Sequence, residues 1–99
     1  MINIVVLLEV DDASALVDYE RIAIRIMKAY GGQLISAYKP IQDDGSDSEI
    51  DEVHIIQFPD LDSFEAYRAD SKLAELSGLR SKAIAMTKIY VSEVAIEYD

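Results

Sequence analysis

The chain has 99 residues, of which 51% are apolar, and its formal net charge at pH 7 is −10. A chain of this length is expected to form a single domain, residues 1–99. The acidity disfavours nucleic-acid and membrane-surface partners, because both are themselves anionic. The absence of cysteine excludes disulfides and thiolate chemistry and agrees with an expected cytoplasmic location.

The first third of the chain predicts a strand, a helix and a second strand. Residues 2–10, INIVVLLEV, are rich in β-branched residues and indicate a strand; they are too few to span a bilayer and lack the basic start of a signal peptide. An amphipathic helix follows and ends at Gly31-Gly32. Residues 33–41 predict a second strand, with Pro40 near its end. The helix is indicated by apolar side chains three and four residues apart: Leu16, Tyr19, Ala23, Ile26, Met27 and Tyr30.

The segment QDDGSDSEIDE, residues 42–52, has six carboxylates and no apolar period. We interpret it as a long hairpin loop. A calcium site is disfavoured because the spacing lacks the glycine and glutamate of an EF-hand loop.

The second half of the chain predicts a strand, a helix and a final strand. Residues 53–58, VHIIQF, form the third strand, which Pro59 ends. The helix would run from Leu61 to Leu76 and break near Gly78, and residues 79–87 would add a turn or two. Residues 88–98, KIYVSEVAIEY, are expected to form the last strand.

This order predicts an α+β, ferredoxin-like βαββαβ domain, a four-stranded antiparallel sheet with two helices on one face. Yet the strands carry apolar residues on both faces. Two helices cover only one face, and an exposed apolar face of this size is unusual in a monomer and would forgo roughly several kcal/mol of hydrophobic stabilisation. We therefore expect a homodimer in which two sheets pack face to face and could enclose a cavity.

The stretch IIQFPDLDSFEAYRAD and the later LRSKAI resemble a family of uncharacterised proteins, the domain-of-unknown-function 1330 family of the dimeric α/β-barrel superfamily. The resemblance implies a dimeric α/β barrel. Relatives in the superfamily include cofactor-independent monooxygenases, haem-degrading enzymes, isomerases and ligand-sensing domains. The chain lacks the tryptophan of the haem-degrading set, and no cofactor is expected. The matching positions are Phe58, Pro59, Phe64, Tyr67, Asp70 and Arg80.

His54 is the only histidine and hence the natural candidate for acid–base catalysis. It shares a strand face with Ile56 and Phe58. If that face lines a cavity, His54 could touch a ligand; otherwise it is a strand histidine whose partner is Glu52 or water. A lone histidine does not favour a metal site.

Four further residues are candidates for ligand binding: Asn3, Tyr38, Tyr67 and Arg80. Asn3 interrupts an apolar strand, as Glu93 does later, and each needs a polar partner if its sheet face is covered. The tyrosines could direct hydroxyls towards a pocket, and Arg80 could bind a carboxylate or enolate. Core packing and pairing with nearby acids are the structural alternatives.

Two functions follow from the sequence. The first is a cofactor-independent enzyme, monooxygenase- or isomerase-like, that acts on a small organic molecule with His54 as proton carrier. The second is a ligand-binding or purely structural dimer without catalysis.

Overall fold

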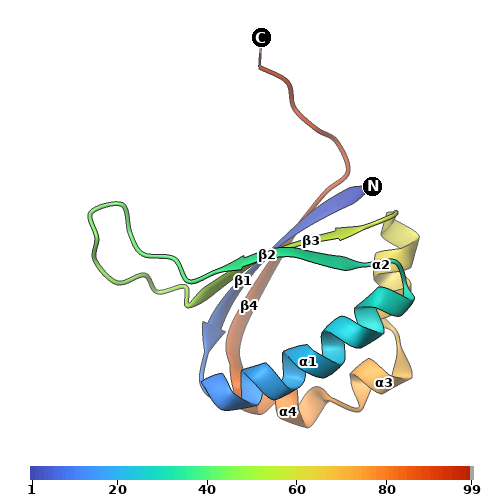
Figure 1. The fold of residues 1–99 in the computed structure, drawn as a ribbon, viewed down its shortest axis with the longest axis horizontal. Coiled ribbons are helices and arrows are strands. Elements are labelled where there is room, and N and C mark those ends of the chain that lie inside the picture. The colour runs from blue at the N-terminus through green and yellow to red at the C-terminus, as the bar shows by residue number, and fades with distance from the viewer. Residues whose placement is uncertain (99) are drawn as a thin grey trace.

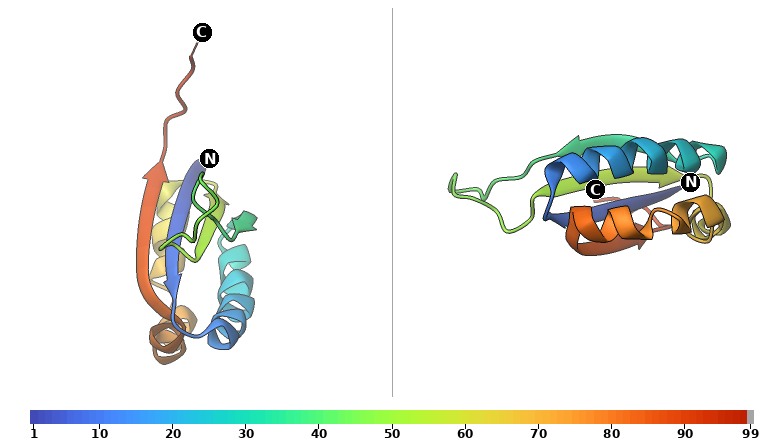
Figure 2. Two further views of the ribbon diagram at one scale, coloured as in Figure 1. Left: turned by 90° about the vertical axis from the view of Figure 1, so that its left-hand side faces the viewer. Right: turned by 90° about the horizontal axis from the view of Figure 1, so that it is seen from below.

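The computed structural model, which describes residues 1–98, is a curved four-stranded antiparallel sheet with all helices on one face (Figures 1 and 2). The strand order is β2-β3-β1-β4, so β1 and β3 are central. This confirms the predicted ferredoxin-like arrangement. The elements are β1 Ile2–Val10, α1 Ala13–Ala29, β2 Gln33–Tyr38, β3 Glu52–Phe58, α2 Leu61–Arg68, α3 Ser71–Ala74, α4 Ser77–Ala83 and β4 Ile84–Ser92.

The covered face of the sheet carries two separate apolar clusters. One gathers around Phe58, which is fully buried against Phe64 of α2. The other gathers around Leu8 and Leu16, where α1 and α4 meet β1. The two clusters meet only through partly buried side chains such as Val6 and Leu73. The core is therefore tight at both ends and looser in the middle.

Helix α1 begins and ends where local chemistry requires. The Asp12 carboxylate accepts a hydrogen bond from the Ala15 amide at 3.0 Å, which is a standard N-cap. Gly31 has a φ of 78°, which favours glycine and lets the chain leave the helix. Gly32 then brings the backbone hard against Met27 and Phe58.

Two short helices, α2 and α3, replace the single helix predicted for Leu61–Leu76, and α4 follows at Ser77–Ala83, where part of the further helical turn predicted for residues 79–87 was expected. The break occurs at Asp70, whose carboxylate accepts from the amides of Lys72 and Leu73 and so starts α3. The Tyr30 hydroxyl also donates to this carboxylate. The expected break at Gly78 is wrong, because that residue lies inside α4.

The predicted strand ends also shift. β2 stops at Tyr38 instead of residue 41, and β4 begins at Ile84, inside the segment expected to be helical. β4 ends at Ser92, which pairs with Asn3 at the start of β1. Beyond that point β4 has no neighbouring strand to pair with. Residues 93–98, predicted as strand, instead leave the sheet as an extended tail (Figures 1 and 2).

The acidic segment between β2 and β3 is a long loop that projects from the sheet, as predicted (Figure 1). An isolated bridge joins Ile41 to Asp47. At its end, the Asp51 carboxylate accepts from the Val10 amide at 2.7 Å. The loop is therefore anchored to the end of β1 while its tip stays in solvent.

The second sheet face carries no helix. The strand register places alternate residues of the four strands on it. Val5, Leu7 and Ile55 lie near its centre and are half-buried, whereas Tyr38 and Tyr90 are exposed. This open face is the one on which the sequence predicted contact with a second copy.

Among residues 1–98, no helix is both long and apolar enough to cross a membrane.

The close packing at Gly32 gives a stability test. A Cβ at this position would overlap Met27 and Phe58, so Gly32→Ala should lower the free energy of unfolding by about 1–3 kcal/mol, the usual cost of overpacking. Gly78→Ala is the matched control, because a Cβ there meets nothing within 4 Å; it should leave stability unchanged or raise it by up to about 1 kcal/mol. Urea unfolding of both variants measures the difference, and equal midpoints would contradict this packing.

Candidate functional site

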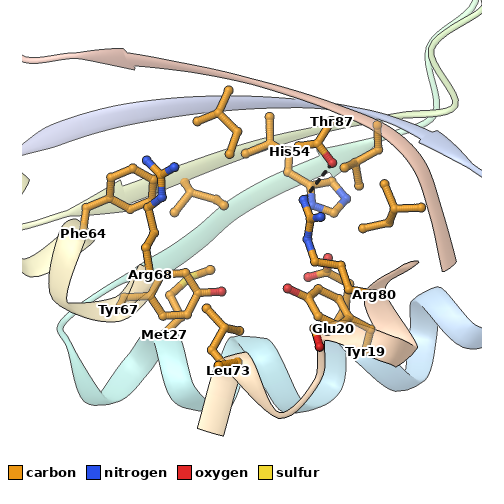
Figure 3. Close-up of a pocket in the computed structure, with 17 residues that line it drawn as sticks. Tyr19, Glu20, Met27, His54, Phe64, Tyr67, Arg68, Leu73, Arg80 and Thr87 are labelled. Atoms are coloured by element: carbon orange, nitrogen blue, oxygen red, sulfur yellow. Dashed lines mark hydrogen bonds between the residues drawn. The ribbon is translucent and has the colours of Figure 1, made fainter. Parts of the chain in front are cut away.

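A cavity of about 360 Å³ lies in the loosely packed middle of the domain, between the sheet and the helices (Figure 3). It is enclosed by one chain and does not need the dimer that the sequence predicted as its source. Exposed residues of α2, α3 and α4 and of β4 border it, so it opens along the gap between these helices and β4. Its aliphatic and phenylalanine lining consists of Val6, Leu8, Met27, Ile56, Phe64, Leu73, Ala74, Ile84 and Ile89.

His54 lies on the wall of this cavity because of strand alternation. Glu52, His54, Ile56 and Phe58 occupy alternate positions of β3, so all four face the helices. His54 is only 4% exposed, and its Nε2 lies 2.8 Å from a carboxylate oxygen of Glu52. The partner anticipated in the sequence is therefore present, and the residue also borders the cavity.

The contact with Glu52 defines which ring nitrogen can act as a base. An ionised carboxylate only accepts hydrogen bonds, so Nε2 carries the proton and Nδ1 is the basic nitrogen of the neutral ring. In residues 1–98, no polar side-chain atom is both fully buried and unpartnered. Since the ring's hydrogen bond is at Nε2, Nδ1 must border accessible space.

Glu20 of α1 is a second acid–base group at the cavity, on the helical side that faces the sheet (Figure 3). Burial raises the pKa of its carboxyl above the ordinary 4.5, and the neighbouring Glu52 adds to the rise, while His54 and Arg80 oppose it. Glu20 and His54 also border a smaller hollow of about 270 Å³ beside α1 and β2, which Glu52 lines too. The two side chains therefore stand between the cavity and a second opening.

Two buried tyrosines contribute hydroxyl groups. Tyr19 and Tyr67 both line the cavity. Burial is the main cause that raises the pKa of each phenol, and the nearby Arg80 partly offsets it. Both phenols therefore stay protonated at neutral pH and can donate hydrogen bonds to a ligand.

Two arginines stand at the opening, on opposite sides (Figure 3). Arg80 of α4 donates from Nη2 to the Thr87 hydroxyl of β4 at 3.0 Å. Arg68 of α2 lies over the Phe64 ring, 5.1 Å from its centroid, and makes a long 3.5 Å contact with Glu65. Both residues are exposed, so their side chains can contact a ligand as it enters.

The structure brings together three of the five residues that the sequence singled out: His54, Tyr67 and Arg80. The other two lie on the open sheet face. Asn3 accepts a hydrogen bond from Gln57 at 2.8 Å, and Tyr38 is 60% exposed. A ligand-binding role for Asn3 and Tyr38 therefore stays a prediction. Glu93 lies in the exposed tail beyond β4.

Sequence reasoning missed Glu20, Tyr19 as a site residue, and Thr87. Tyr19 was counted only as part of the apolar stripe of the first helix. Glu20 stands four residues after Leu16 and three before Ala23, which places it at the edge of that stripe. A carboxylate beside a buried stripe was the available signal. Thr87 carried none, since it fell in a segment expected to be helical.

No group of three or more histidine, aspartate or glutamate side chains within residues 1–98 could hold a metal ion.

The raised pKa of Glu20 predicts a pH effect on stability. The folded chain holds this proton more tightly than the unfolded chain, so the resulting stabilisation is complete below pH 4.5 and is lost as pH rises through the raised pKa. Glu20→Gln removes this titration. The wild type should therefore lose stability relative to Glu20→Gln as pH rises above 4.5. Urea unfolding of both proteins at several pH values measures this difference in the free energy of unfolding.

Glu65→Gln is the control for this comparison, because Glu65 is exposed on α2. Its difference from the wild type should not follow the same curve. A constant difference between Glu20→Gln and wild type across this range would contradict the burial of the Glu20 carboxyl.

Solved structures share this fold. A protein of unknown function from Rhodopseudomonas palustris superposes with a TM-score of 0.81 at 17% identity, covering 97% of this chain and 83% of that chain. A putative antibiotic biosynthesis monooxygenase from Nitrosomonas europaea gives 0.71 at 11% identity, covering 97% and 100%. A protein from Arabidopsis thaliana gives 0.72 at 7% identity, covering 99% of both chains.

Among curated proteins, none is significantly similar to this chain in sequence. Residues 3–94 match the family described as Domain of unknown function (DUF1330). This match spans nearly the whole domain, including every strand and helix around the cavity. The protein therefore belongs to the DUF1330 family.

Proposed function

We propose that this protein binds a small organic molecule in the cavity and moves a proton to or from it without a cofactor. The observation that carries the proposal is the buried His54, which borders the cavity while its Nε2 is held 2.8 Å from Glu52. A carboxylate in this position fixes the ring and stabilises the imidazolium that forms when Nδ1 takes a proton. Glu20 is the nearby group with a raised pKa that can serve as an acid.

The surroundings suit this chemistry. The cavity is mainly apolar with a few converging polar groups, which is the usual character of a small-molecule site. At roughly 30 Å³ per water, its volume would hold about a dozen waters, or a ligand of similar heavy-atom count. The proton that His54 takes from a ligand can be passed on to solvent, because the side chain of its partner Glu52 is 24% exposed. The reaction class that fits best is proton abstraction next to a carbonyl, as in an isomerase.

The likeness to a putative antibiotic biosynthesis monooxygenase supports a related possibility. Removal of a proton from an electron-rich substrate is a step that His54 and Glu52 could supply in an oxygenase-like reaction as well. Both versions assign the same role to the same residues.

The second candidate function is ligand binding without catalysis. It is favoured by the fact that His54 already has a protein partner, which is also what a purely structural histidine needs. The two candidates differ in one measurable property, namely whether a bound carbonyl compound loses its α-protons faster.

Hydrogen–deuterium exchange of 4-phenylbutan-2-one in D₂O, followed by NMR, separates the two candidates. We expect the wild-type protein to accelerate exchange next to the carbonyl, and His54→Gln to reduce this acceleration by about 10²–10⁴-fold, the usual range for a general base. Glu52→Gln should give a smaller loss.

Glu49→Gln, in the exposed acidic loop, is the control and should exchange the probe at the wild-type rate. Binding of the ketone with no acceleration of exchange would favour the non-enzymatic candidate. Acceleration that is indifferent to His54→Gln would remove His54 from the mechanism.

We also propose that the protein forms a homodimer through the open sheet face. Val5, Leu7 and Ile55 are half-buried on this face and Tyr38 and Tyr90 are exposed. In a single chain this leaves an apolar surface that bears on no helix, and such surfaces commonly mark protein contacts. A second copy presents the same surface, so a two-fold contact is self-complementary.

Light scattering at micromolar concentration tests the dimer. The wild-type protein should show twice the mass of the 11.0 kDa chain, and Ile55→Lys should show the mass of one chain, because it places a charge at the centre of the contact. Ile22→Lys, on the exposed side of α1, should stay dimeric. A wild-type monomer at this concentration would refute the proposal.

A further inference from the structure

The opening of the cavity concentrates positive charge in a protein that is otherwise acidic. The chain carries 19 acidic and 9 basic residues. Two of the basic residues, Arg68 and Arg80, nevertheless line this one cavity. Among residues 1–98, the lining of the cavity includes one carboxylate residue, Glu20, and burial raises the pKa of its carboxyl.

Arg80 has no carboxylate partner among residues 1–98. The ion pairs of this part of the chain involve His54, Arg68 and Lys82, each with a nearby acid. Arg80 donates one side-chain hydrogen bond of ordinary length, from Nη2 to the Thr87 hydroxyl, and it also lies close enough to the Tyr19 phenol to interact with it. A guanidinium has five N–H donors in a planar fork, so most of them remain available at the mouth of an apolar cavity.

The bond to Thr87 gives this guanidinium a defined place. Thr87 is on β4 and Arg80 on α4, so the contact crosses the opening (Figure 3). Arg80 is also close enough to Tyr19 and Tyr67 to influence the pKa of both phenols. A ligand held by Arg80 would therefore have hydroxyl donors beside it and the apolar lining beyond.

Arg68 is less available for the same role. Its guanidinium lies over Phe64 and contacts Glu65, and a half-exposed pair of this kind contributes little energy. It adds positive potential on the far side of the opening rather than a vacant fork. The two arginines therefore differ in role, and Arg80 is the specific anchor.

We propose that the ligand of this cavity is an amphipathic organic anion, whose carboxylate pairs with Arg80 while its apolar body lies between Phe64 and Ile56. A carboxylate matches the planar guanidinium fork with two parallel hydrogen bonds. The inference rests on the proposed function, because it assigns a chemical class to the molecule bound in the same cavity. It excludes neutral apolar molecules as preferred ligands.

The test uses two probes of the same shape, 3-phenylpropanoate and 3-phenylpropanamide, titrated into ¹⁵N-labelled protein and followed by NMR. Hydrogen bonds to charged groups contribute more than neutral ones, so the wild type should bind the acid roughly tenfold or more tightly than the amide. The largest shifts should fall on Tyr67, Arg80 and Thr87. High salt should reduce the preference for the acid.

Arg80→Gln should abolish the preference for the acid and leave binding of the amide within about twofold, because only the charged contact is lost. Arg80→Lys keeps the charge without the fork and should retain part of the preference. Arg25→Gln, an exposed α1 arginine outside the cavity, makes the same change in net charge and should keep the full preference.

Each outcome decides a different statement. Equal binding of acid and amide to the wild type, or a preference that survives Arg80→Gln, would overturn this inference and leave the cavity as a binding site. Failure of both probes to shift any residue around the cavity would overturn the proposed function as well. Circular dichroism of the Arg80 variants confirms that they are folded, which is expected for an exposed position.

Discussion

The alternation of side chains along β3 is the constraint on which the rest of the structure depends. A strand directs successive residues to opposite faces, so Glu52, His54, Ile56 and Phe58 share one face. Phe58 and Ile56 require helices above them, and the helices that cover them also enclose His54. The two-residue alternation of this strand therefore places both the core side chains and an ionisable ring beneath the helices. A shift of register by one residue would expose Phe58 and move His54 to the open face.

The cavity exists because the helical layer is not continuous over this face. Phe58 and Phe64 fill one end, and Leu8 and Leu16 fill the other. Between them, the chain leaves α2 and begins α3 at Asp70, the N-cap of α3. The hydroxyl of Tyr30, at the C-terminal end of α1, donates a hydrogen bond to Asp70 and fixes this junction. A single straight helix would have covered the middle of the sheet. The junction instead leaves room where His54, Glu20 and Arg80 meet.

The sequence was sufficient for the fold and for part of the site. Strand and helix periods are local properties, so the βαββαβ order and the common face of His54, Ile56 and Phe58 could be predicted, whereas the sequence left open which side of the sheet that face occupies. The break at Asp70 has a local cause, the N-cap that its carboxylate forms on α3, but no sequence pattern favoured it over Gly78; the contact with Tyr30, forty residues away, is a tertiary effect. The start of β4 was predicted wrongly because residues 83–87, AIAMT, have no strong hydrophobic period, and residues 84–87 become strand by pairing with β1. Glu20 acquires its character from burial beside Glu52, which again is a tertiary effect.

The tail after β4 has a consequence for how the protein behaves at high concentration. Residues 93–98 extend beyond the last paired position, with Val94, Ile96 and Tyr98 all more than 70% exposed. An extended apolar segment with free backbone groups is a template for intermolecular β-pairing. Glu93 and Glu97 alternate with these apolar residues and act as gatekeepers, because stacking the segment would bring like charges together. The placement of these carboxylates therefore opposes pairing between tails of neighbouring copies, in addition to the repulsion from the overall net charge.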